Sequence, residues 1–91
     1  MFLMTVSVYI LFSATLDRYY VGCTTDSLYQ RIRRHLSEHK GFTARAKDWV
    51  LVYQESFENK TDALKREKEI KKWKSAERIK LLIDQINRAS R

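Results

Sequence analysis

Apolar and polar side chains alternate along the first part of the chain. Between residues 5 and 11, valine or isoleucine occupies every even position, and this period of two predicts a half-buried β-strand. A second β-rich segment is predicted at Arg18–Gly22. The loop between them, residues 12–17, is too short for a parallel crossover, so the two strands are expected to form an antiparallel hairpin. A third strand is predicted at 50–57, which is rich in β-branched and aromatic residues.

Three further segments carry a helical pattern. A first helix is predicted from about Asp26 to His39, a second from a cap at Asn59 or Thr61 to about Lys74, and a third after a cap at Ser75. The order β-β-α-β-α-α predicts an α/β (α+β) fold: a small, three-stranded, mainly antiparallel sheet flanked by helices. The apolar positions are Leu28, Ile32 and Leu36 in the first helix, and Ile79, Leu82, Ile83 and Ile86 in the third.

Length and composition limit the organisation. A chain of 91 residues with 44% hydrophobic residues is expected to form one globular domain, 1–91, with a core at about 5–74 and a C-terminal helix at about 75–88. The single Cys23 has no partner for an internal disulfide, which favours a reducing, cytoplasmic setting. The apolar opening segment lacks the basic start of a signal peptide, and no stretch reaches the length of a membrane span.

Charge is distributed unevenly along the chain. Residues 1–30 carry a net charge of −1, whereas residues 31–91 carry 17 basic and 9 acidic side chains, for a net +8. Such asymmetry favours a polyanionic partner, a nucleic acid (DNA or RNA) above others, over a basic surface that only aids solubility. The candidate nucleic-acid-binding residues are Lys40, Arg45 and Lys47 in a loop, and Lys65, Lys68, Lys71 and Lys72 on the second helix.

Glu67 has an unexpected place in the second helix. In helical projection it falls between Leu64 and Ala63, inside the arc expected to face the core. An ionised carboxylate there is costly unless a positive charge compensates it. Two compensations remain open: an ion pair with an arginine or lysine, which is the commoner fate of such residues, or a bound divalent cation.

Four other polar residues could join Glu67. Arg31 and His35 are spaced i, i+4 and therefore project from one helix face. Tyr9 and Tyr20 lie on the two strands of the predicted hairpin, where their hydroxyls could converge on the first helix. Taken singly, each is typical of ordinary packing or of a solvated surface.

These residues together resemble the GIY-YIG nuclease family, especially its small single-domain bacterial members, which are similar to the N-terminal nuclease domain of a bacterial excinuclease. The resemblance runs from Val8 to about Lys74, with the elements in the same order. The matching segments are Val8-Tyr9-Ile10, Tyr20-Val21-Gly22, Arg31-x-x-x-His35 and Ala63-Leu64-x-x-Glu67-x-x-Ile70-Lys71.

The resemblance implies a role for each of five catalytic residues. Tyr20 would act as the general base or orient the attacking water, and Tyr9 would position it by hydrogen bonding. Glu67 would hold one Mg²⁺ or Mn²⁺ ion, a hard cation suited to carboxylate oxygen and water. Arg31 would stabilise charge on the phosphoryl oxygens, and His35 would position water or phosphate or assist proton transfer.

Three positions depart from the family pattern. Val8 replaces the first glycine and Val21 the second isoleucine, both at positions that serve the strands. Cys23 stands where some relatives carry a lysine that could lower the pKa of the catalytic tyrosine. The absence of that lysine from this chain bears on the rate of the reaction.

The resemblance therefore implies a divalent-metal-dependent endonuclease that hydrolyses DNA phosphodiester bonds with low sequence specificity or with a preference for DNA structure. It further implies a role in DNA repair or recombination, with a partner protein as one source of targeting and no association with membranes. Two alternatives remain: a nucleic-acid-binding module on the same fold with little turnover, and a small RNA-binding or ribosome-associated protein on a different scaffold.

Overall fold

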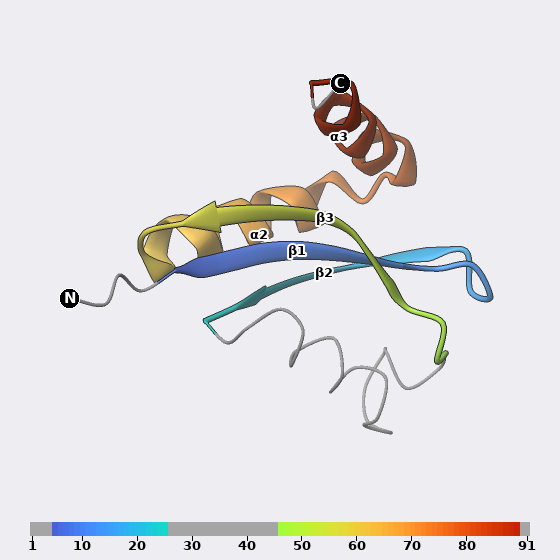
Figure 1. Cartoon of the computed structure of the whole chain (residues 1–91), viewed down its shortest axis with the longest axis horizontal. Coiled ribbons are helices and arrows are strands. Elements are labelled where there is room, and N and C mark those ends of the chain that lie inside the picture. Colours follow the sequence, from blue (N-terminus) through green and yellow to red (C-terminus); the bar gives the residue numbers. More distant parts are fainter. Residues whose placement is uncertain (1–4, 26–45, 90–91) are drawn as a thin grey trace.

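Three antiparallel strands form the centre of the molecule (Figure 1). The computed structural model describes residues 5–25 and 46–89. Strands β1 (Val6–Ser13), β2 (Arg18–Thr24) and β3 (Val50–Phe57) pair in the order β2-β1-β3. The predicted fold class, a small antiparallel sheet with helices, is confirmed. The predicted first helix lies outside the described residues.

Strand β1 is the central strand, and both of its faces are buried. Val8 and Ile10 face one side, Tyr9 and Leu11 face the other, and all four are 0% exposed. The prediction that this strand is only half-buried is therefore wrong. Its alternation does not mark a solvent-facing side, because a second apolar cluster covers the face that carries Tyr9.

Helices α2 (Lys60–Trp73) and α3 (Ala76–Ala89) cover the face that carries Val8 and Ile10 (Figure 1). Ala63 and Ile70 of α2 are fully buried there, and Ile79 of α3 is 8% exposed. Capping defines both helices, as predicted: the Asn59 side chain accepts a hydrogen bond from the backbone N–H of Asp62, and Ser75 Oγ accepts one from the N–H of Arg78. Leu82 and Ile83 also pack against this cluster, whereas the side chain of Ile86 is outside the described part.

The strands of the hairpin are longer than predicted. β1 continues to Ser13 and β2 to Thr24, so the connecting turn is confined to residues 14–17. Gly22 lies inside β2, paired with Tyr9 of β1, rather than ending the strand. Neither described helix is long and apolar enough to cross a membrane.

Asp48 connects the segment before β3 to the β1–β2 hairpin turn through hydrogen bonds. Its carboxylate accepts hydrogen bonds from Ser13 Oγ at 2.6 Å and from both the backbone N and Oγ1 of Thr15 at 2.9 Å. The Ser13 bond, followed by the bonds from Thr15, lowers the pKa of Asp48 to about 2. The pattern of residues around Asp48 did not indicate this role.

The stability of the protein is expected to depend on Asp48 at acidic pH. Because the pKa is lowered on folding, this stabilisation is present above the ordinary aspartate pKa of 3.8 and is lost as the pH falls toward about 2. Denaturant unfolding of wild type and Asp48→Asn at a series of pH values should show the difference in stability shrinking between pH 4 and 2. Parallel pH profiles for the two proteins would contradict this assignment.

Candidate active site

Tyr9 and Tyr20 lie on the same face of the sheet, on the neighbouring strands β1 and β2. Their ring centroids are 6.5 Å apart. The ring of Tyr9 crosses Gly22 so closely that a Cβ atom built on Gly22 would be 2.4 Å from Tyr9 Cζ and from its hydroxyl oxygen. The hydroxyl of Tyr9 is thereby carried over β2, which is an edge strand of the described sheet.

Trp49 supports this pair of tyrosines, and sequence reasoning missed it. The side chain is 2% exposed and packs in one cluster with Tyr9 and Leu11. Its ring stands edge-on to that of Tyr20, with centroids 6.4 Å apart. The sequence shows an aromatic residue directly before the strand predicted at 50–57, but this position does not indicate which residues it contacts.

Glu67 projects from α2, on the opposite face of the sheet from the tyrosines. Its side chain is 16% exposed, and its Oε1 lies 3.5 Å from Nζ of Lys71, one helical turn away. The ion pair with a lysine that the sequence left open is therefore present. Leu64, expected in the core, is 36% exposed; the buried side of α2 is centred on Ala63 and Ile70, with Glu67 beside it.

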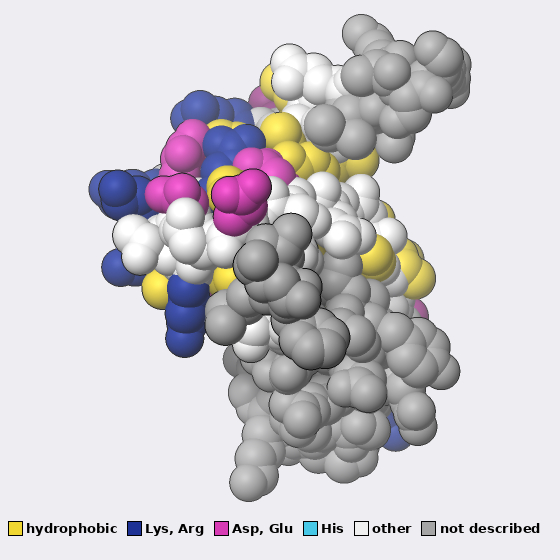
Figure 2. All heavy atoms as spheres, turned by 60° about the vertical axis from the view of Figure 1, so that its left-hand side comes forward, with side chains coloured by type: hydrophobic (Ala, Val, Ile, Leu, Met, Phe, Trp, Pro, Cys, Tyr) yellow, Lys and Arg dark blue, Asp and Glu magenta, His cyan; other side chains and the backbone are white. Residues whose placement is uncertain are grey.

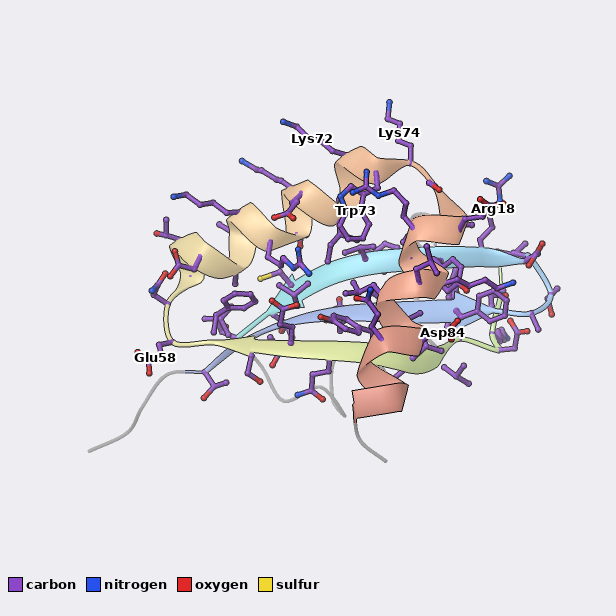
Figure 3. The ribbon with its side chains drawn as sticks, turned by 90° about the horizontal axis from the view of Figure 1, so that it is seen from above. Arg18, Glu58, Lys72, Trp73, Lys74 and Asp84 are labelled. Atoms are coloured by element: carbon purple, nitrogen blue, oxygen red, sulfur yellow. The ribbon has the colours of Figure 1, made fainter. Side chains whose placement is uncertain are left out.

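A network on the other side of α2 fixes the rotation of the helix. Arg66 bonds to Glu55 of β3 at 3.2 Å and to Glu69 at 2.8 Å, and Tyr53 donates a hydrogen bond to Glu55. The guanidinium of Arg66 also lies 5.7 Å from the ring centroid of Trp73, the labelled tryptophan in Figure 3. Because Arg66 is held toward β3, its neighbour Glu67 is directed toward β2.

Glu67 lines a hollow of about 210 Å³ beside the end of β2. The same hollow is lined by Cys23 and Thr24 of β2, by Thr25, and by Lys60 at the start of α2. Burial, and after it the negative charge of Glu67, raises the pKa of the Cys23 thiol. Glu67 is therefore close to Cys23 of β2. The next residue of the strand, Gly22, lies under the hydroxyl of Tyr9 on the opposite face of the sheet.

The oxygen ligands around this hollow suit a hard divalent cation that binds through few protein contacts. Within residues 5–25 and 46–89, no group of three or more His, Cys, Asp or Glu side chains gathers around one point. Mg²⁺ commonly binds through one or two carboxylates and keeps several water molecules. One carboxylate beside the exposed Thr25, at a hollow open to solvent, fits that mode.

Four of the predicted site residues form two groups around β2. Tyr9 and Tyr20 are together on one face, and Glu67 and Lys71 are together on the other. Lys47 is exposed in the segment before β3. Arg31, His35, Lys40 and Arg45 lie outside the described residues.

The other predicted lysines of α2 are on the surface. Lys65, Lys68 and Lys72 are exposed, and Figure 2 shows Lys and Arg side chains around α2 with acidic side chains between them. The acidic residues Glu55, Asp62 and Glu69 are bonded within the network of Arg66 or at the cap of α2. Lys60 and Lys71 instead line the hollows on the β2 side.

The chain is similar to known proteins over most of its length. The model of the GIY-YIG catalytic domain matches residues 5–80. The UPF0213 protein SSP2268 of Staphylococcus saprophyticus is 36% identical over 73 residues, covering 70% of this chain and 89% of the relative; the UPF0213 protein SH2523 of Staphylococcus haemolyticus is 34% identical with the same coverage. No solved structure matches the chain significantly. Because the family match spans most of the chain, including the whole sheet and α2, the chain belongs to the GIY-YIG catalytic domain family.

Proposed function

We propose that this protein is a divalent-metal-dependent endonuclease that hydrolyses phosphodiester bonds in DNA. The observation that carries the proposal is the arrangement around β2. The tyrosine pair occupies one face of this edge strand, and Glu67 reaches the strand from the other face at Cys23. A phosphodiester lying along the strand edge would be within reach of groups from both faces.

Each candidate site residue around β2 has a distinct role in this proposal. Tyr20, held by Trp49, orients the attacking water through its hydroxyl or, as the phenolate, accepts a proton from it, and Tyr9 supports Tyr20 from the centre of the sheet. Glu67 holds the cation, which neutralises developing charge on the phosphate when it is bound. Lys71 gives up its contact with the Glu67 carboxylate and turns to a phosphate of the substrate.

The assignments outside the described residues follow from the family. Arg31 would stabilise the phosphoryl oxygens in the transition state, and His35 would position water or phosphate. Lys40 and Arg45, with the lysines of α2, would contact backbone phosphates, which carries no sequence information. We therefore expect a preference for DNA structure over sequence, in a repair or recombination role and in the cytoplasm.

The lysines of α2 are expected to set the salt dependence of DNA binding. Removing one phosphate contact lowers the slope of log K against log salt by about 0.9, so Lys68→Ala/Lys72→Ala should lower it by about 2. Lys80→Ala removes an exposed charge on α3, away from Lys68 and Lys72, and serves as the control. Fluorescence anisotropy at four salt concentrations gives the slopes, and equal slopes for all three proteins would remove these lysines from the interface.

Cleavage of a panel of labelled DNAs tests the proposed function. The panel contains duplex, single-stranded, flapped and four-way DNA, each with Mg²⁺, with Mn²⁺ or with EDTA. Cutting that requires the metal and favours one DNA structure is expected. Binding without cutting under every condition would reject the nuclease and leave a nucleic-acid-binding module.

A further inference from the structure

A second hollow opens where α2 passes into α3, and it is larger than the one beside Glu67. It measures about 480 Å³ and lies between the first half of β2 and the junction of the two helices. This volume is within the range of about 300–1,000 Å³ that is typical of small-ligand sites. Of the three candidate catalytic residues that the structure describes, Tyr20 lines it and Tyr9 and Glu67 do not.

The rim of this hollow is positively charged. Among residues 5–25 and 46–89, Arg18, Lys71 and Lys74 line it, together with one acidic residue, Asp17. Figure 3 shows Arg18 beside the junction of α2 and α3, and Lys74 projecting from the end of α2. Lys74 has φ 48° and ψ 33°, the left-handed conformation that ends α2 and places its side chain at this rim. Three positively charged side chains at one opening complement the negative charge of a phosphate group.

The floor of the hollow is apolar. Val21, Ile70 and Ile79 form it, and their side chains are 7%, 0% and 8% exposed. The ring of Tyr19 adds an aromatic wall. Burial, together with the charges of Asp17 and Asp84, raises the pKa of Tyr19, so its phenol stays neutral at physiological pH. A neutral aromatic wall over an apolar floor suits a flat, uncharged ring such as a nucleobase.

The hollow adjoins the part of the candidate active site that contains Glu67. Lys71 lines it and also lies 3.5 Å from Glu67, and β2 borders it as far as Tyr20, whose ring packs on the opposite face of the sheet. A nucleotide seated here would belong to the strand whose phosphodiester lies at β2. A base that is stacked and paired in a duplex cannot enter a hollow of this kind, because its faces and its pairing edge are occupied.

We propose that the hollow between β2 and the α2–α3 junction binds one unpaired nucleotide of the substrate, next to the bond that is cut. The three cations hold its phosphate, and Tyr19 with the apolar floor holds its base. The inference rests on the proposed nuclease function and narrows its substrate to nucleic acid with an unpaired nucleotide at the cleavage site. It also gives α3 a function, since Ala76 and Ile79 form one wall.

Filling the hollow tests the proposal without altering a candidate catalytic residue. Ala76 is exposed at the start of α3 and lines the hollow, so Ala76→Trp should block it and leave the core intact. Leu81→Trp is the matched control, because Leu81 is 61% exposed on the same helix and does not line the hollow. Anisotropy in EDTA then compares a blunt duplex with the same duplex carrying a short single-stranded flap, at one salt concentration.

Wild type and Leu81→Trp are expected to bind the flapped DNA roughly five-fold or more tightly than the blunt duplex, in keeping with one added base stack. Ala76→Trp should lose this preference with its affinity for the blunt duplex unchanged. An Ala76→Trp protein that keeps the preference would overturn the proposal, and so would a wild type without one.

Binding of a mononucleotide separates this proposal from the nuclease function. Deoxyadenosine monophosphate should shift the amide resonances of Val21, Ser75 and Ala76 in wild type, and inorganic phosphate should shift them much less. Equal shifts with phosphate alone would reduce the hollow to an anion site and overturn the proposal. Mononucleotide binding by a protein that cuts nothing in the DNA panel would reject the nuclease and retain the nucleotide site.

Discussion

Glu67→Gln is expected to lower metal-dependent cleavage by about 10²–10³-fold, on the scale of removing one electrostatic contribution to transition-state stabilisation. The amide keeps the size of the side chain but removes the negative charge that a hard cation requires. Folding should be nearly unaffected, because the ion pair with Lys71 is long and lies at the surface. Single-turnover cleavage rates in Mn²⁺, with thermal unfolding measured in parallel, give both quantities.

Glu69→Gln is the matched control for this change. Glu69 is on the same helix, but its side chain is 56% exposed and bonds to Arg66 on the side of α2 that faces away from β2. Its replacement should leave cleavage within about two-fold of wild type, as expected for a weak surface ion pair. Near wild-type cleavage by Glu67→Gln would show that the cation is held by other residues.

Gly22→Ala should be the most destabilising small substitution in the sheet. The new Cβ would meet Tyr9 Cζ and the Tyr9 hydroxyl oxygen at 2.4 Å and Cε2 at 2.8 Å. Tyr9 is 0% exposed and packs against Leu11 and Trp49, so its ring has little space into which to move. Overpacking of this kind costs about 1–3 kcal/mol. Urea unfolding measures the loss, and cleavage should fall too because Tyr9 is displaced from Tyr20.

Removing the ring of Tyr9 tests whether this contact is the cause. In Tyr9→Ala the obstructing atoms are absent, so adding Gly22→Ala to that background should cost much less than it does in wild type. Neighbouring residues that share a contact show such non-additivity, whereas independent sites do not. Equal costs of Gly22→Ala in the two backgrounds would assign its effect to the backbone of β2.

Local pattern predicted the strands and helices well but not the depth of burial of β1. The alternation from residue 5 to 11 reports only that one face is apolar. The other face packs against Ala46 and Trp49, which are distant from β1 in the sequence. Tyr9 has an apolar ring and a polar hydroxyl, so its presence is compatible with either side of a strand.

Gly22 and Glu67 were misplaced for a similar reason. A glycine at the end of a β-rich segment is typical of a strand end, but Gly22 is needed inside β2 because of the ring of Tyr9 on the next strand. Helical projection placed Glu67 within the apolar arc of α2. The bonds of Arg66 to Glu55 of β3 turn that arc so that Leu64 is exposed and Glu67 lies beside β2.

Part of the candidate site was predictable, because family motifs preserve spacing along the chain. Tyr9 and Tyr20 were expected to share one face, and they do. That Glu67 approaches from the opposite face was not foreseen, since helix periodicity does not indicate which side of a sheet a helix covers. Asp48 and Trp49 matter through contacts with the hairpin, for which their own sequence positions give no signal.

Tyr20 and Glu67, from opposite faces of β2, are proposed to act in one reaction. Single-turnover cleavage by wild type, Tyr20→Phe, Glu67→Gln and the double mutant tests it most directly, with circular dichroism to confirm that all four are folded. Residues that act as a unit give strongly non-additive losses. We expect a large loss of rate in each single mutant, and a double mutant no slower than the slower of the two. Losses that multiply, or a single mutant as fast as wild type, would contradict it.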